Sequence, residues 1–233
     1  MKLADNSNRL IILIALLMCI GTPFYGTEKN QDTETLWEVE LSKKFKKSIE
    51  ISLGEELRTR DFVNEINRLS TTVGISYNHP QFKQLKVGGE YNFLNYFEYN
   101  KFEENRHRIA LHIQYKYSYA GFDFSFRSRF QSTFRDETRG DYKVNPKHIW
   151  RNRIGIAYNI YGTPYEPYFN FEISNPVRNT TGNQINRLRY RVGCEYRFNK
   201  KQAFDLFFRC TQEINEKNAM NTYSIGLGYK FKL

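Results

Sequence analysis

Arginine and glutamate residues alternate with apolar residues along much of the chain, and they carry most of its potential for chemistry. In residues 187–197, for example, charged or small residues occupy every second position, and aromatic or other apolar residues lie between them. A period of two places all the charged side chains on one face of an extended strand. The predicted charged face includes Arg108, Arg127, Arg129, Arg153, Arg189, Arg191, Arg209, Glu50, Glu56, Glu90, Glu172 and Glu195.

The sequence is compatible with two roles for such a charged face. Arginine and glutamate side chains can interlock and fill a narrow interior, because buried charges are tolerated when they are paired and hydrogen-bonded. An excess of arginine can instead select anions in a pore.

The histidine and serine residues raise the alternative of a hydrolase. Acyl hydrolysis would need a serine, a histidine and an acid within hydrogen-bond reach. His107 and His148 are expected near strand ends, with Ser128 and Ser132 at comparable heights. Nothing in the sequence groups these residues into a known signature, so we predict a protein without enzymatic activity.

Metal, cofactor and nucleic-acid binding are not indicated. The chain has no paired cysteine or histidine spacing of the zinc type, so we predict neither a metal site nor a cofactor. The formal net charge of +10 is spread over many segments instead of one helix or loop, which argues against nucleic acid as a partner. Cys194 should lie opposite a residue near position 207, too far from Cys210 for a disulfide.

The alternating segments predict strands throughout the chain, and no segment has a convincing helical period. The fold class we predict is all-β, an antiparallel transmembrane β-barrel of about 10–12 strands. Our count is close to eleven, whereas bacterial single-chain barrels are normally even, so the parity stays open. If the turn at 43–47 is periplasmic, the first strand would run parallel to the last. The expected strands are 36–42, 49–57, 69–77, 85–93, 109–119, 122–130, 150–160, 165–173, 188–198, 204–210 and 223–233.

The connections are expected to alternate in length, as in outer-membrane barrels with long external loops and short periplasmic turns. Long loops are predicted near 58–66, 97–105, 134–147, 174–186 and 212–221, and short ones near 78–84, 119–121, 160–164 and 199–202.

The N-terminus has the features of a secretory signal. The apolar run Leu10–Ile20 follows Lys2 and Arg9 and is too short to span a membrane as a helix. We predict a signal peptide at 1–26, cleaved after Gly21 or Gly26, then a linker at 27–35 and an outer-membrane barrel at 36–233. The predicted location is the cell outer membrane.

The C-terminal strand alternates up to the last residue. Gly228, Phe231 and Leu233 fit the terminal signal that the barrel-assembly machinery recognises, although a terminal phenylalanine would fit better. The expected partners are this machinery, outer-membrane lipids and lipopolysaccharide. The oligomeric state is open.

Three stretches carry a family resemblance: Leu36–Phe45 (LWEVELSKKF), Glu55–Arg58 (EELR) and Thr72–Tyr77 (TVGISY). With them, the region from about 36 to 233 resembles an uncharacterised family of Gram-negative, Bacteroidetes-type bacteria, catalogued as domain of unknown function 2490. The resemblance implies an outer-membrane barrel and supplies no catalytic or ligand-binding residue.

From these observations we expect a non-enzymatic outer-membrane barrel. Its role would be structural, or the narrow, porin-like passage of small and anionic solutes. The alternatives are a surface barrel that binds ligands through long external loops and an outer-membrane lipid hydrolase.

Overall fold

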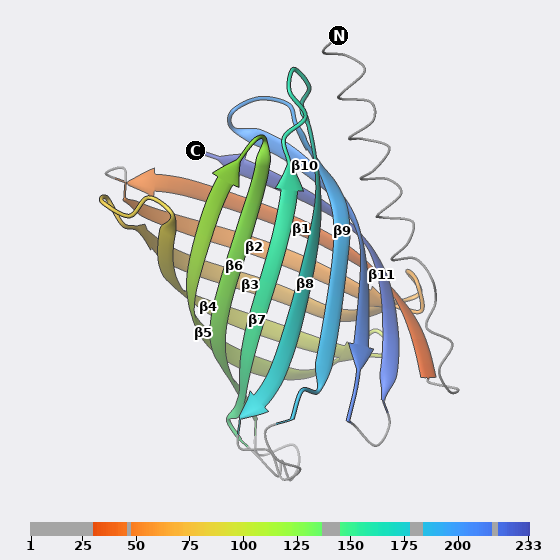
Figure 1. The fold of residues 1–233 in the computed structure, drawn as a ribbon. Helices are drawn as coiled ribbons and strands as arrows, with labels where there is room; N and C mark the ends of the chain where they lie inside the picture. Colours follow the sequence, from red (N-terminus) through yellow and green to blue (C-terminus); the bar gives the residue numbers. More distant parts are fainter. Residues whose placement is uncertain (1–29, 46–47, 137–144, 178–183, 216–218) are drawn as a thin grey trace.

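The chain folds into a closed β-barrel. The computed structural model describes residues 30–233 except 46–47, 137–144, 178–183 and 216–218, so the predicted signal peptide lies outside the described residues (Figure 1). No helix suited to crossing a membrane occurs in the described residues. The strands are β1 (Asn30–Phe45), β2 (Ile49–Arg60), β3 (Glu65–Asn78), β4 (Leu85–Glu98), β5 (Lys101–Tyr119), β6 (Phe122–Arg135), β7 (Lys147–Tyr158), β8 (Tyr165–Val177), β9 (Arg187–Arg197), β10 (Gln202–Glu213) and β11 (Met220–Lys232).

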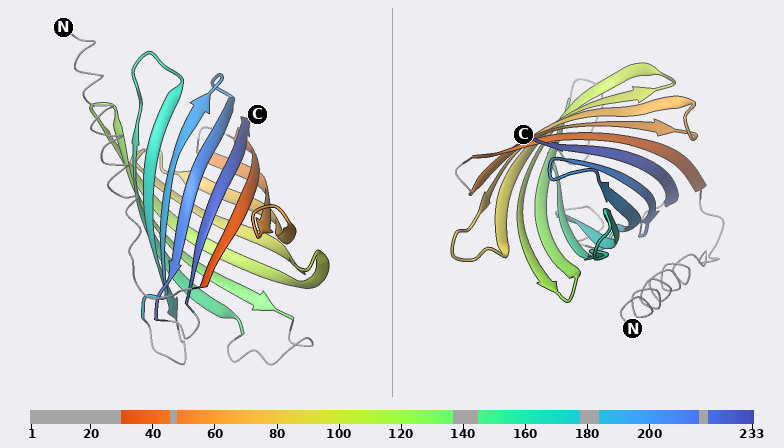
Figure 2. Two further views of the ribbon diagram at one scale, coloured as in Figure 1. Left: turned by 90° about the vertical axis from the view of Figure 1, so that its right-hand side faces the viewer. Right: turned by 90° about the horizontal axis from the view of Figure 1, so that it is seen from above.

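The barrel closes between its first and last strands. Neighbouring strands pair antiparallel around the barrel, but β1 and β11 pair parallel, from Asn30 opposite Met220 to Ser42 opposite Lys232. Figure 2 shows orange β1 lying beside blue β11 along this seam. With eleven described strands that alternate in direction, the first and last must point the same way. The predicted all-β barrel is confirmed. The number of strands, which the sequence left open as even or odd, is odd in the described chain.

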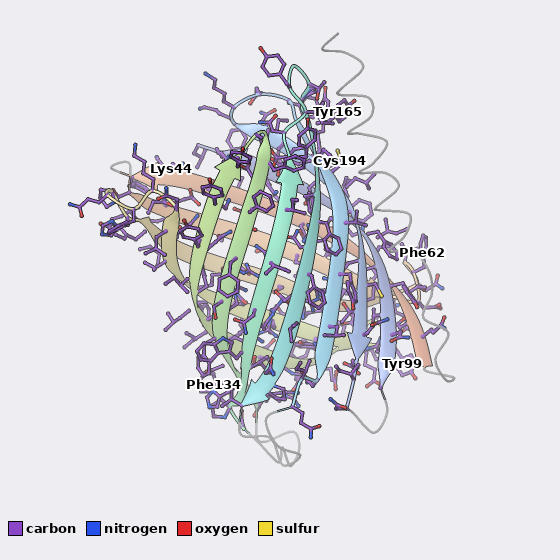
Figure 3. The ribbon with its side chains drawn as sticks, in the orientation of Figure 1. Lys44, Phe62, Tyr99, Phe134, Tyr165 and Cys194 are labelled. Atoms are coloured by element: carbon purple, nitrogen blue, oxygen red, sulfur yellow. The ribbon has the colours of Figure 1, made fainter. Side chains whose placement is uncertain are left out.

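The outer wall of the barrel is apolar and the inner wall is polar. Leu111, for example, is 63% exposed on the outside, whereas the neighbouring inward residue Ala110 is buried. Figure 3 shows side chains along the whole outer wall, with Tyr165 and Cys194 near one end and Tyr99 and Phe134 near the other. Ion pairs and hydrogen bonds fill much of the interior, in place of the apolar core of a soluble barrel.

Two of the predicted long loops are wrong. The connection from β2 to β3 is residues 61–64, and that from β4 to β5 is residues 99–100. Tyr99 and Asn100 both have positive φ, of 49° and 60°, as the central residues of a tight two-residue hairpin turn require. The flanking polar residues continue the strands because their side chains find partners inside, as Glu104 does with Arg106.

The barrel also begins earlier than the predicted boundary at residue 36. Strand β1 starts at Asn30, within the expected linker 27–35. Residues 30–35 are polar on both faces, so their alternation is invisible in the sequence. They are nevertheless held as a strand, because Glu34 is buried and bonded to Arg209.

The two described cysteines are free, as the strand pairing predicted. Cys194 lies opposite Leu206, one position from the expected partner. Cys210 lies opposite Tyr190 on the same outward face.

Candidate functional site in the barrel lumen

Glu172 is the centre of the most highly charged cluster in the lumen. It lies on β8, and it is only 3% exposed. Arg151 on β7 approaches its carboxylate to 2.5 Å, Arg189 on β9 to 3.2 Å and Arg127 on β6 to 3.3 Å. Charge-assisted bonds of this kind compensate the cost of burying the carboxylate. One negative charge is therefore shared by three guanidinium groups.

The neighbouring strands β6 and β7 carry four arginines, which we call the arginine block: Arg127, Arg129, Arg151 and Arg153. Arg127 lies directly opposite Arg153, and Arg129 lies directly opposite Arg151. Like charges at directly opposed positions destabilise a sheet. Arg129 is paired with Glu90 at 2.5 Å. Arg153 forms no ion pair with any residue that the structure describes, so the block keeps an excess of positive charge.

A second cluster surrounds Asp205 on β10, which is buried. Its carboxylate accepts hydrogen bonds from the Tyr168 hydroxyl at 2.8 Å and from Arg191 Nη2 at 2.8 Å. Arg191 also reaches Glu38 at 3.2 Å, and its guanidinium stacks 3.5 Å from the centre of the Phe207 ring. Two carboxylates, the Tyr168 hydroxyl and the Phe207 ring thus hold Arg191 in place.

A third cluster ties the parallel seam together from inside. Glu34 on β1 accepts hydrogen bonds from Arg209 on β10 at 3.1 Å and from Ser224 on β11 at 3.2 Å. Arg58 on β2 lies 3.7 Å from the same carboxylate and 3.2 Å from Glu56. Glu56 in turn pairs with Arg68 on β3. The seam is thus joined by buried ion pairs as well as backbone bonds.

The remaining predicted charges lie outside these clusters. Glu50 pairs with Lys86 at 2.8 Å, and Glu195 pairs with Lys230 at 2.6 Å and Arg197 at 2.9 Å. The Arg197 side chain is 45% exposed, compared with 6% for Arg209. Arg108 Nε donates a hydrogen bond to Thr133 Oγ1 at 3.1 Å.

Sequence reasoning missed several partners of these charges. Asp205 occupies the inward phase of its strand, so its position was readable from the alternation. Tyr168 shares the inward phase with Glu172, but only the fold shows that its hydroxyl reaches Asp205. Glu34 and Arg58 were missed because they fell in the expected linker and an expected loop.

The outer wall places a serine and a histidine in contact near the end of the barrel opposite the C-terminus. Ser132 Oγ and His148 Nδ1 are 2.8 Å apart, and the Phe130 ring stacks against His148. Ser128 is not part of this pair, because it bonds to Asn152 and Trp150. His107 contacts the Tyr91 hydroxyl at 2.7 Å. In the part of the chain that the structure describes, neither histidine is bonded to a carboxylate, and no group of three metal-ligating side chains occurs.

The residues of the predicted assembly signal lie at the C-terminal end of β11. Gly228 lies opposite Asp205, and Phe231 pairs with Leu41 of β1. The Leu233 N–H donates a hydrogen bond to the Ser42 carbonyl oxygen at 2.8 Å. The role of these residues in assembly stays a prediction.

The closed strand order, apolar outer wall and charged interior define a barrel of porin-like fold. Among solved structures, the chain is similar to the porin NanC in a rhombohedral crystal form, with a TM-score of 0.53 and 12% identity over 87% of this chain and 99% of that one. Residues 34–231 match the family model described as "Protein of unknown function (DUF2490)", so the chain belongs to this family, as its sequence predicted. No curated protein matches the chain.

Proposed function

We propose that the protein is a non-enzymatic barrel of the bacterial outer membrane that passes small anionic solutes through a narrow lumen. The membrane location is supported by the apolar outer wall and the porin-like fold. Outer-membrane lipids and lipopolysaccharide would surround that wall, and the barrel-assembly machinery would insert the chain.

The uncompensated arginine block is the observation that carries the preference for anions. Three of its four arginines, together with Arg189, share only two carboxylates among the described residues, Glu172 and Glu90, and Arg153 pairs with neither. In a narrow passage with low-dielectric walls, one sign of charge concentrates counter-ions and repels co-ions. Arginine-lined constrictions select anions on the same principle.

Planar-bilayer recording tests passage directly. The purified full-length protein should produce discrete conductance steps in potassium chloride, because the side chains of the arginine block remain partly exposed within the lumen. If the protein inserts into the bilayer but never opens at any voltage, the proposed passage of solutes is contradicted. A structural role would then be the remaining interpretation.

A lipid hydrolase on the outer wall is the second candidate, favoured by the contact between Ser132 and His148. A serine–histidine pair can supply a nucleophile and its base, but catalysis also needs groups that orient the histidine and stabilise the oxyanion. His148 lacks a carboxylate partner among the described residues.

We therefore expect no hydrolysis of phospholipid or lipid A by the purified wild-type protein. The measurement is release of fatty acid from mixed micelles, with Ser132→Ala and His148→Ala as comparisons. Hydrolysis by the wild type that either substitution abolishes would replace the non-enzymatic proposal.

The third candidate, ligand binding by long external loops, has less support. Two of the loops on which it relied, 58–66 and 97–105, are mostly strand. Parts of the loops between β6 and β7 and between β8 and β9 lie outside the described residues.

A further inference from the structure

The geometry of the arginine block is specific enough to indicate a class of ligand. Directly opposed residues on antiparallel strands have Cβ atoms about 5 Å apart. Residues two apart on one strand are separated by about 7 Å. Arg127, Arg129, Arg151 and Arg153 therefore project from a patch about 5 Å by 7 Å at its base. A small polyvalent group could contact several of these guanidiniums at once.

The charges around this patch do not balance. Both oxygens of Glu172 are engaged, Oε1 by Arg151 and Arg189 and Oε2 by Arg127. Glu90 is engaged by Arg129 and also lies 3.6 Å from His112 Nδ1. Arg153 faces Glu172 in the strand register but forms no ion pair with it. Four arginines, including Arg189, thus share two carboxylates, and Arg153 is paired with neither of them.

Hydrogen-bond donors are left over at the same place. The Nε–H groups of Arg127, Arg129 and Arg153 are buried and have no acceptor among the described residues. In contrast, Arg151 Nε donates to Glu172 at 3.0 Å. Buried donors without partners cost free energy, so acceptors are expected at this place. Some other lumen arginines have free Nε–H groups too, but those of the arginine block are adjacent and coincide with uncompensated charge.

We infer that Arg127, Arg129 and Arg153 form a binding site for a doubly charged tetrahedral oxoanion, either inorganic phosphate or the phosphate ester group of a small solute. A group of this kind presents several acceptor oxygens and a charge near −2, and guanidinium groups bind phosphate through paired, charge-assisted bonds. Chloride or a single carboxylate would accept fewer hydrogen bonds and would neutralise less of the positive charge of the arginine block. The inference deepens the proposed passage of anions and rests on it for its biological role.

The site is within reach of solutes in the lumen. The Arg127 and Arg129 side chains are 15% and 12% exposed, and they lie on the inner wall.

Thermal unfolding of the full-length, detergent-solubilised protein tests the site. Phosphate that binds the folded barrel raises its Tm, and the rise grows with the logarithm of its affinity. At constant ionic strength, inorganic phosphate should raise the Tm of the wild type, and chloride should not. Arg153→Gln should weaken phosphate binding at least about tenfold, since it removes a charged hydrogen-bond donor. Without phosphate, its Tm should not fall below that of the wild type, because the repulsion from Arg127 is relieved.

Arg60→Gln is the matched control. It makes the same change of side chain at the end of β2, where the Arg60 side chain is 46% exposed and strands β3, β4 and β5 separate it from β6. This variant should keep the wild-type response to phosphate. Glycerol phosphate, tested beside inorganic phosphate, distinguishes a site for phosphate esters from one for the free ion.

The site is overturned if phosphate does not stabilise the wild type, or if it stabilises Arg153→Gln equally well. Failure of the site is distinguishable from failure of passage. Chloride currents without a phosphate effect would overturn the site and leave passage standing. Phosphate-dependent stabilisation without current would support the site and contradict passage.

Discussion

Glu172→Gln is expected to lower the free energy of unfolding by about 3–5 kcal/mol, the range seen when one partner of a buried ion pair is removed. Glutamine keeps the size of the side chain but removes the charge that Arg127, Arg151 and Arg189 share. All three guanidiniums would then repel one another across β6, β7 and β9. The effect should exceed that of any other single charge removal in the lumen.

Heat-modifiable gel mobility and urea unfolding in detergent measure this effect. Glu195→Gln is the matched control, because its partners Lys230 and Arg197 are far more exposed and the change should cost little. Adding Arg189→Gln to Glu172→Gln should restore part of the lost stability. Equal stability of Glu172→Gln and the wild type would show that the cluster around Glu172 does not hold the barrel together.

Gly226→Ala is expected to destabilise the barrel by about 1–3 kcal/mol through overpacking. Gly226 on β11 lies opposite Phe207 on β10, and a Cβ atom at this position would overlap the Phe207 ring. The ring cannot easily move away, because it is buried and the Arg191 guanidinium stacks on it.

A double-mutant cycle tests this packing. In a Phe207→Ala background, Gly226→Ala should cost much less, since the overlap is gone. Gly54→Ala is the control, because a Cβ there would make only ordinary contacts, the nearest at 3.6 Å to the Val39 carbonyl oxygen. A cost for Gly226→Ala that is equal in both backgrounds would contradict the close approach of Phe207.

The fold was largely predictable because alternation records which face of a strand is apolar. Residues 109–119 show this well, since the odd-numbered residues from Ile109 to Tyr119 are all exposed on the outer wall. The seam was harder, because residues 30–35 are polar on both faces and only their pairing with β11 makes them a strand.

The clusters in the lumen could be predicted only in part. Alternation places Arg127 and Glu172 on the inner face, but their contact joins β6 to β8 across β7. Such a contact depends on barrel curvature and side-chain reach, which no local pattern records. The same is true of Arg153, which has no ion partner among the described residues because neighbouring arginines divide the carboxylate of Glu172.

The central claim is that the arginine-rich lumen passes anions in preference to cations. The reversal potential of the purified protein in a planar bilayer, under a gradient of potassium chloride, measures this preference directly. We predict a reversal potential of the sign set by chloride, shifted toward zero by Arg129→Gln together with Arg153→Gln. A reversal potential of the sign set by potassium would contradict it.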